Sequence, residues 1–156
     1  MSTSSTTQAT IDFIRAEISA SMQVKQALWA DVALLEQLAR LADACLDALR
    51  SGGKVIFAGN GGSFADAQHL SAEFTSRFMF DRAPLASLAL GTNSSAISAI
   101  GNDYGYEQVF ARELQGIARP GDIFIPISTS GNSANILAAV KMANNLGVKT
   151  LAWTGA

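Results

Sequence analysis

The sequence has little charge, little proline and a single cysteine. Of its 156 residues, 15% are charged, three are proline and only Cys45 is cysteine. One cysteine excludes a disulfide framework within the chain and is typical of proteins from a reducing compartment. The net charge of −2 gives no basic surface for nucleic acid or for an anionic membrane.

Long apolar runs and targeting signals are also missing. No stretch of about 18 consecutive apolar residues predicts a helix that spans a membrane. The Ser/Thr-rich segment 1–10 has neither the basic nor the apolar region of a secretory signal, so we interpret it as a polar, frayed lead-in. We therefore expect a cytoplasmic protein without nucleic-acid or membrane partners.

Apolar side chains are plentiful: they make up 49% of the residues and exclude a disordered chain. A chain of this length can bury about 70% of its unfolded surface, so a single domain over 1–156 needs no disulfide or metal to fold. The low charge and abundant alanine indicate that much of the surface is hidden, and contacts between subunits are one way to hide it.

Residues 11–50 contain no proline or glycine, and their apolar residues recur at helical spacing. We predict one helix, or two with a break between Met22 and Leu28, with Thr10 as the N-cap and a stop at Ser51-Gly52-Gly53. Two interpretations have equal support. The segment is either a helical layer that faces the core of the chain or a helical hairpin that packs against another subunit.

The remaining residues, 54–156, alternate between strands and helices, which predicts a parallel α/β sheet with helices on both faces. The predicted strands are residues 54–58, 85–90, 123–127 and 148–153. The predicted helices are residues 63–80, 94–100, 107–117 and 134–146. Pro126 weakens the prediction that the third strand lies in the middle of the sheet, because proline has no N–H to donate.

Two strand-to-helix loops have the composition of an anion site. Asn60-Gly61-Gly62-Ser63 follows the first predicted strand, and Ser128-Thr129-Ser130-Gly131-Asn132-Ser133 follows the third. Glycine lets a backbone approach a ligand closely, and the N–H groups at the start of the next helix favour an anion. Because the two loops match, we favour phosphate binding over the alternative that these serines and glycines only form turns and helix caps.

The same loops argue against a nucleotide cofactor. No Gly-Lys-Ser/Thr of a Walker loop follows the glycines, which disfavours nucleotide hydrolysis. The dinucleotide pattern Gly-x-Gly-x-x-Gly, counted from Gly59, fails at Phe64, where its last glycine would stand. We therefore expect no nucleotide cofactor.

His69, the only histidine, and Glu73 are four residues apart in a predicted helix, so they project from one helix face. This spacing suits two metal ligands or a carboxylate base beside an imidazole. From the spacing alone, an ordinary surface pair is the better interpretation. The small and apolar neighbours on this helix, and its start at the first loop, favour a functional pair, because a carboxylate near a bound sugar phosphate can move protons.

Several motifs in order resemble the sugar isomerase (SIS) domain family and, within it, the phosphoheptose isomerases. The resemblance runs from about Ile11 to Ala156 and rests on residues 59–63, 65–69, 72–73, 77–78, 100–106, 119–122 and 127–133. It implies a flavodoxin-like three-layer parallel sheet preceded by an N-terminal helical segment. It also implies a homotetramer whose sites lie at subunit interfaces.

The resemblance implies a role for each matching residue. Glu73 would be a catalytic acid/base, and His69 and Glu73 would be two of the zinc ligands found in some members. The substrate would be held by Asn60, Gly61, Gly62, Ser63, Glu73, Asn102, Asp103, Ser128, Thr129, Ser130 and Ser133. The hydroxyl-bearing residues of the second loop would hold the phosphate and the adjoining part of the sugar chain.

The implied reaction is the aldose–ketose isomerisation of sedoheptulose 7-phosphate to D-glycero-D-manno-heptose 7-phosphate, which feeds bacterial heptose and lipopolysaccharide synthesis. A base removes the proton beside the carbonyl to give an enediol, and an acid returns it at the neighbouring carbon. The alternatives are a non-enzymatic SIS-domain protein that binds the bacterial replication initiator and a domain that senses a phosphosugar. Glu73 and Ser130 favour the enzyme over the first, and the lack of a helix-turn-helix or basic segment argues against the second.

The resemblance also sets an expectation about the end of the chain. Phosphoheptose isomerases continue well beyond the position that matches Ala156, with a last strand, a final helix, a glutamine ligand and a second catalytic histidine that is also a ligand. We therefore expect these residues to be a piece of a longer chain rather than a divergent or inactive member. The remaining zinc ligands would come from that further segment.

Overall fold

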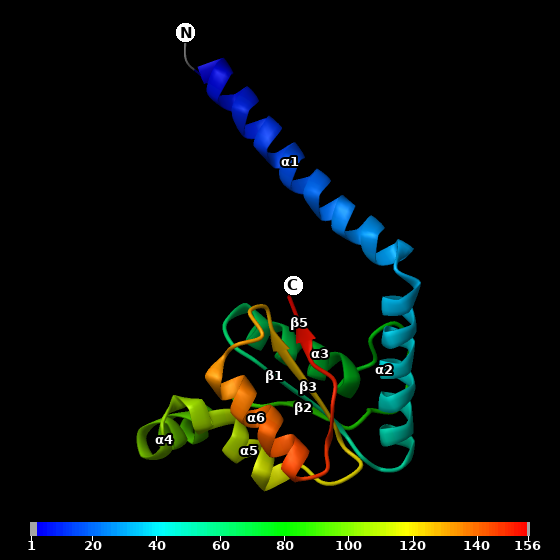
Figure 1. Cartoon of the computed structure of the whole chain (residues 1–156), viewed down its shortest axis with the longest axis vertical. Helices are drawn as coiled ribbons and strands as arrows, with labels where there is room; N and C mark the ends of the chain where they lie inside the picture. The colour runs from blue at the N-terminus through cyan, green and yellow to red at the C-terminus, as the bar shows by residue number, and fades with distance from the viewer. Residues whose placement is uncertain (1–2, 156) are drawn as a thin grey trace. The chain divides into compact units, whose positions relative to one another are not determined.

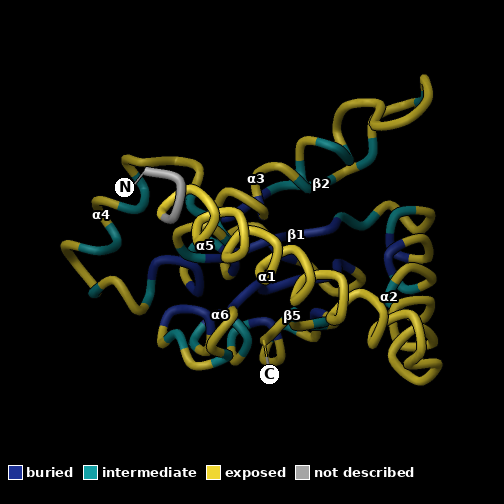
Figure 2. The backbone as a smooth tube through the Cα atoms, turned by 90° about the horizontal axis from the view of Figure 1, so that it is seen from above, coloured by how far each residue is buried: buried dark blue, intermediate teal, exposed yellow. Residues whose placement is uncertain are grey.

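The N-terminal part of the chain forms two helices, α1 (Thr3–Ala30) and α2 (Val32–Arg50). A computed structural model describes residues 3–155 and divides into two compact units, Met1–Ala42 and Asp43–Ala156. From Thr6 onward every side chain of α1 is exposed, which Figure 2 shows as a continuous yellow tube. The large apolar side chains among the exposed residues of the first unit are Ile11, Phe13, Ile14, Ile18, Met22, Val24, Leu28, Trp29, Val32, Leu34, Leu35 and Leu38.

The two helices are separated at Asp31, so the predicted break between Met22 and Leu28 is wrong. The carboxylate of Asp31 accepts a hydrogen bond of 3.0 Å from the backbone N–H of Leu34. This is the contact of an N-cap residue, and it starts the second helix with only Asp31 between it and the first. Helical spacing of apolar residues continues on both sides of Asp31, which is why the periodicity alone misplaces the break.

The predicted N-cap at Thr10 is also wrong. The helix begins at Thr3, and Thr10 lies inside it, where its hydroxyl donates to the carbonyl oxygen of Thr6 at 2.9 Å. Residues 3–10 of the predicted polar lead-in are therefore helical, whereas residues 1 and 2 lie outside the described part. The C-terminal stop is confirmed: α2 ends at Arg50, and Gly52 follows with φ +82.

The second unit contains a parallel five-stranded sheet in the order β2-β1-β3-β4, and β5 also pairs with β3 (Figure 1). Its strands are β1 (Val55–Gly59), β2 (Ser87–Ala89), β3 (Ile123–Ser128), β4 (Lys149–Thr150) and β5 (Trp153–Thr154). Its other helices are α3 (Gly62–Thr75), α4 (Ser94–Tyr104), the short 3₁₀ helix η1 (Tyr106–Gln108), α5 (Val109–Ile117) and α6 (Ala134–Asn145). The prediction of a parallel α/β sheet is confirmed.

Different helices cover the two faces of this sheet. Side chains alternate along a strand, so Ile56, Ala58 and Phe124 share one face, and they form a buried cluster with residues of α5 and α6. Phe57 faces the other way, and its ring centroid lies 5.9 Å from that of Phe74 in α3. The sheet is thus the middle of three layers, and its buried strands form the dark blue centre of Figure 2.

β3 is a central strand although it contains Pro126, because it pairs with β1 on one side and with β4 and β5 on the other. The carbonyl oxygen of Phe124 accepts a hydrogen bond from the N–H of Leu151, so the polar groups of Phe124 face β4. Pro126 lies two residues further and faces the same side. Its missing N–H falls where the neighbouring strand is interrupted, between Thr150 and Trp153. The predicted single strand 148–153 is therefore two short strands.

Two helix ends differ from the predicted ones. α3 ends at Thr75 rather than near Phe80, and the guanidinium of Arg82 donates to the carbonyl oxygens of Glu73 and Phe74 in its last turn. α4 continues beyond Ile100 to Tyr104, and the next residue, Gly105, has φ +88.

Among the helices of residues 3–155, none has both the length and the apolar character needed to cross a bilayer.

Candidate functional site

The two predicted loops emerge side by side at one edge of the sheet. Gly59 at the end of β1 pairs with Ile127 near the end of β3, and both strands run in the same direction. Residues 60–63 and 129–133 therefore follow the carboxyl ends of neighbouring strands. The sheet order β2-β1-β3-β4 reverses its direction between β1 and β3, and ligands of such sheets bind at this switch point.

The helices that start at these loops lack side-chain caps. Gly61 precedes α3 and Ser133 precedes α6, and neither contributes a side-chain hydrogen bond to the first turn. α4 is different, because the side-chain oxygen of Asn93 accepts a hydrogen bond of 3.1 Å from the N–H of Ala96. The first N–H groups of α3 and α6, together with the positive ends of both helix dipoles, are thus available to an anion.

The serine-rich loop brings several hydroxyl groups together. Ser128 is buried at the end of β3, and its Oγ lies 3.3 Å from the Oγ of Ser133 at the start of α6. The Oγ of Ser130 accepts a hydrogen bond of 3.2 Å from the N–H of Asn132. Gly131 has φ +66, a conformation that favours glycine and closes the turn between them. The loop presents small polar groups and contains no charged side chain.

Gly59 is required where β1 turns into the first loop. A Cβ at this position would collide with the backbone carbonyl of Ser63, which returns over the end of the strand in the first turn of α3. Only glycine lets the loop fold back this closely. The glycine at position 59 is therefore explained by the close approach of the Ser63 backbone, without any ligand.

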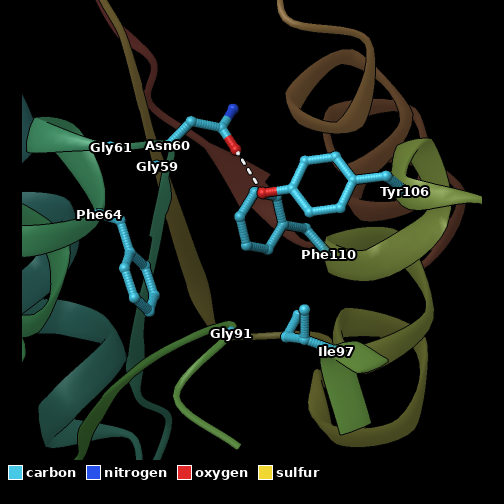
Figure 3. Close-up of a pocket in the computed structure, with 8 residues that line it drawn as sticks. All are labelled: Gly59, Asn60, Gly61, Phe64, Gly91, Ile97, Tyr106 and Phe110. Atoms are coloured by element: carbon cyan, nitrogen blue, oxygen red, sulfur yellow. Dashed lines mark hydrogen bonds between the residues drawn. The ribbon is translucent and has the colours of Figure 1, made fainter. Parts of the chain in front are cut away.

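Asn60 belongs to a hydrogen-bond network beside a small cavity (Figure 3). Its side chain forms two reciprocal hydrogen bonds of 2.9 Å with Asn135 in the first turn of α6. The hydroxyl of Tyr106 donates to the Oδ1 of Asn60 at 3.3 Å. The cavity, of about 110 Å³, is lined by Gly59, Asn60, Gly61, Phe64, Gly91, Ile97, Tyr106 and Phe110.

Sequence reasoning missed Asn135, which has no place in the predicted set. A signal was present, because Asn135 is a polar residue directly next to Ile136 on the inward-facing side of a predicted helix, and both are buried. Tyr106 stood inside one of the motifs that carry the resemblance but was given no role. A buried polar residue in the first turn of a helix after a glycine-rich loop is the pattern that could have revealed the network.

His69 and Glu73 lie together on α3, as their spacing predicted. Their closest side-chain atoms, Nε2 and Oε1, are 3.8 Å apart, with 74% of the His69 side chain and 34% of the Glu73 side chain exposed. They line a mostly apolar pocket of about 340 Å³ with Leu70, Phe74, Phe78, Arg82 and Leu85. Glu73 is eleven residues beyond the start of α3, which is about 16 Å along the helix. One chain therefore does not bring this carboxylate to the two loops.

Asn102 and Asp103 lie at a third place. Both are exposed in α4, and the side-chain amide of Asn102 donates to the carboxylate of Asp103 at 2.8 Å. They line an open pocket with Ser94, Ser95, Ser98 and Ala99. The predicted site residues thus form three groups in one chain: the two loops, the His69–Glu73 pair and the polar face of α4.

The described residues do not complete a metal site. In the part of the chain that the structure describes, no group of three or more histidine, cysteine, aspartate or glutamate side chains could hold a metal ion. His69 and Glu73 offer one nitrogen and one carboxylate, which are suitable zinc donors, but a tetrahedral zinc site needs further ligands. The two residues fit part of such a site only.

Comparison with known proteins agrees with these features. A model of the SIS domain family matches residues 20–155. A phosphoheptose isomerase from Aneurinibacillus thermoaerophilus is 50% identical over 145 residues, which are 93% of this chain and 73% of that protein. The structure of a phosphoheptose isomerase from Neisseria gonorrhoeae matches 93% of this chain and 74% of its own, with a TM-score of 0.85 and 41% identity. That from Francisella tularensis matches 94% of this chain and 76% of its own, with a TM-score of 0.89 and 36% identity.

Proposed function

The chain belongs to the SIS domain family, and we propose that it is a phosphoheptose isomerase that converts sedoheptulose 7-phosphate to D-glycero-D-manno-heptose 7-phosphate. The observation that carries this proposal is the pair of uncapped helix N-termini, which meet at the switch point of the sheet. Relatives of that name at 50% and 48% identity support the assignment of the reaction.

The two loops would hold the substrate, with its phosphate end at the serine-rich loop. Hydroxyl hydrogen bonds to the phosphate would come from Ser128, Thr129, Ser130 and Ser133. The first N–H groups of α6 would donate further hydrogen bonds, and the positive end of its helix dipole would favour the negative charge. Residues 60–63 would hold the adjoining part of the sugar chain together with the start of α3. Asn102 and Asp103 would contact the substrate from α4.

Glu73 would supply the acid/base chemistry. Its carboxylate would take the proton from the carbon beside the carbonyl and leave an enediol, after which an acid returns a proton at the neighbouring carbon. The carbonyl moves from one carbon to the next, and no oxidant is consumed. Because Glu73 lies far along α3 from the loops of its own chain, we propose that it serves substrate held by another copy.

A homotetramer with sites at subunit interfaces would bring these parts together. The exposed apolar side chains of the first unit, and the consecutive exposed residues Phe78, Met79 and Phe80 after α3, offer surfaces for such contacts. We propose a cytoplasmic enzyme that supplies heptose for lipopolysaccharide.

Zinc would be bound only with additional ligands. His69 and Glu73 would provide two of them, and the others would come from residues outside the described set. No catalytic step is assigned to the metal, because the donors present here do not define its site.

The direct test is to incubate the full-length protein with sedoheptulose 7-phosphate and to follow the aldoheptose phosphate by NMR. Conversion that is lost in Glu73→Gln, with assembly unchanged by analytical ultracentrifugation, supports the proposal. A wild-type protein that binds sedoheptulose 7-phosphate but never converts it would instead be a phosphosugar-binding protein.

A further inference from the structure

The side-chain amide of Asn60 has nearly all its hydrogen-bonding capacity in use. Its Oδ1 has two lone pairs, which accept hydrogen bonds from the Nδ2 of Asn135 and the hydroxyl of Tyr106. Its Nδ2 has two hydrogens, and one of them is donated to the Oδ1 of Asn135. A single N–H of the Asn60 amide is left without a partner in this network.

Asn135 is in a position to fix this arrangement. Only 4% of it is exposed, and its amide faces Asn60 across the gap between the β1 loop and α6. Breaking the pair would leave a buried amide without its hydrogen-bond partner, which is unfavourable. The two reciprocal bonds therefore hold the β1 loop against the first turn of the helix that follows the serine-rich loop.

The hydroxyl of Tyr106 selects one of two possible orientations of the Asn60 side-chain amide. A reciprocal amide pair is satisfied equally well when both amides rotate by half a turn, but a phenolic hydroxyl that donates to Asn60 selects the orientation in which Oδ1 faces Tyr106. Figure 3 shows this contact as a dashed line among the residues that line the cavity, with the Asn60 nitrogen turned away from the Tyr106 ring.

We propose that Asn135 and Tyr106 are positioning residues that hold Asn60 so that its remaining N–H is donated to an oxygen of the bound phosphosugar. The identity of the ligand rests on the proposed function, whereas the orientation of Asn60 rests on the network alone. Asn60 then acts as a hydrogen-bond donor to the substrate.

The two tyrosines of the sequence provide a matched test. Tyr106 is 60% exposed and Tyr104 is 51% exposed, so removal of either hydroxyl leaves no cavity in the core. The Tyr104 ring lies under the guanidinium of Arg112, 3.7 Å from it, a contact that needs no hydroxyl. Among the described residues, no hydrogen bond involves the Tyr104 hydroxyl, whereas that of Tyr106 donates to Asn60.

We expect Tyr106→Phe to raise KM for sedoheptulose 7-phosphate about three- to tenfold, the effect of one lost neutral hydrogen bond, with an unchanged Tm. Tyr104→Phe should leave both values at the wild-type level. Equal KM values in the two variants would overturn the role of Tyr106. A Tm that falls in step with the KM change would show that the hydroxyl is merely structural.

Asn135→Asp tests the amide pair without changing its size. One carboxylate oxygen would face the Oδ1 of Asn60, so we expect KM to rise more than tenfold and the Asn60 amide to lose its fixed orientation. The ¹⁵N order parameter of the Asn60 side chain, near 0.8 in the free wild-type protein, should fall below about 0.6 in the variant. An order parameter that is low in the wild type, or unchanged in Asn135→Asp, overturns the proposal.

This order parameter is measured without substrate. It therefore tests the hydrogen bonds of Asn60 even if the wild-type protein does not isomerise the sugar. A wild type without turnover but with a rigid Asn60 amide would refute the proposed function and retain the positioning role. A wild type with turnover but a mobile Asn60 amide would support the proposed function and refute the positioning role.

Discussion

The two halves of the candidate site differ in how far one chain completes them. The half that we propose binds the sugar phosphate lies at the ends of β1 and β3, where backbone pairing sets the loops side by side and Asn135 ties the first loop to α6. The half that we propose for the acid/base chemistry lies on α3, where the side chain of Glu73 is 34% exposed and lies 3.8 Å from the largely exposed His69. Backbone geometry brings the two loops together within one chain, whereas it leaves Glu73 about 16 Å along α3 from them.

The electrostatic surroundings of the two halves differ in the same way. In the loops, helix dipoles and hydroxyl groups are fixed before any ligand arrives, which is the condition for strong electrostatic binding. At Glu73, the guanidinium of Arg82 donates to the backbone carbonyl oxygen at 2.7 Å, while the carboxylate lies 3.8 Å from His69. Changes in the two halves should therefore act on different kinetic parameters.

The largest effect is expected for Glu73→Gln. The amide keeps the size of the side chain but cannot accept the proton, so kcat should fall about 10²–10⁴-fold. Binding of inorganic phosphate, measured by calorimetry, should be unchanged, since it depends on the other half. Glu36→Gln is the control, because Glu36 only pairs with Arg40 on an exposed helix face at 3.7 Å. Loss of phosphate binding in Glu73→Gln would show that the two halves are not separate.

Ile18→Glu tests whether other copies complete the acid/base half. Ile18 is an exposed apolar residue of α1, and a charge there would oppose burial between subunits. We expect dissociation in analytical ultracentrifugation and a loss of kcat of tenfold or more at low protein concentration. Ser19→Glu adds the same charge one position along the helix and serves as the comparison. Full activity in a monomeric Ile18→Glu variant would assign the whole site to one chain.

Ser128→Ala should act on the binding half. The change removes a hydroxyl that lies 3.3 Å from that of Ser133, and a hydrogen bond to a charged phosphate contributes about 1.5–3 kcal/mol. KM for sedoheptulose 7-phosphate should rise at least tenfold, with a smaller change in kcat. Ser51→Ala, at the opposite edge of the sheet, should change neither. A fall in kcat without a rise in KM would contradict a role in ground-state binding.

The smallest effect is expected for Glu113→Gln and appears as a pH dependence. Burial raises the pKa of the Glu113 carboxyl, and a hydrogen bond from the N–H of Gly91 partly opposes this shift. The folded state then binds the proton more strongly than the unfolded state, so the contribution of Glu113 to stability is complete below its ordinary pKa and is lost as pH rises through the raised value. Glutamine stays neutral and can accept the same hydrogen bond.

The Tm of Glu113→Gln should therefore exceed that of the wild type at pH 8, by about 1–2 °C, and the two should converge toward pH 4. Thermal unfolding across this pH range measures the difference. Parallel Tm curves at all pH values would show that the carboxyl does not titrate differently in the folded state.

The sequence predicts the binding half better than the acid/base half, for a physical reason. A glycine-rich loop after a buried strand is a local signal, and parallel pairing brings two such loops together automatically. The break at Asp31 and the interruption of the last strand beside Pro126 are equally local but depend on a single side-chain cap and a missing N–H, which hydrophobic periodicity does not register. Residues 1 and 2, at the start of the predicted lead-in, lie outside the described part.

Two features could not come from the sequence. The reciprocal bonds of Asn60 and Asn135 join residues 75 positions apart, and no local pattern specifies a partner at that distance. The spacing of His69 and Glu73 places them on one helix face but says nothing about how far that face lies from the loops. The predicted site residues therefore form three separate groups in one chain, the two loops, the His69–Glu73 pair and the Asn102–Asp103 pair, and their roles stay predictions.

The missing caps of α3 and α6 have a consequence for the stability of the protein. A helix whose first N–H groups lack a side-chain acceptor forgoes about 1 kcal/mol that a serine or asparagine cap would provide. A bound sugar phosphate would supply acceptors to both helices, with its phosphate at α6 and the adjoining sugar oxygens at α3. Folding and ligand binding are then thermodynamically linked, and the protein should be most resistant to heat when its substrate is abundant.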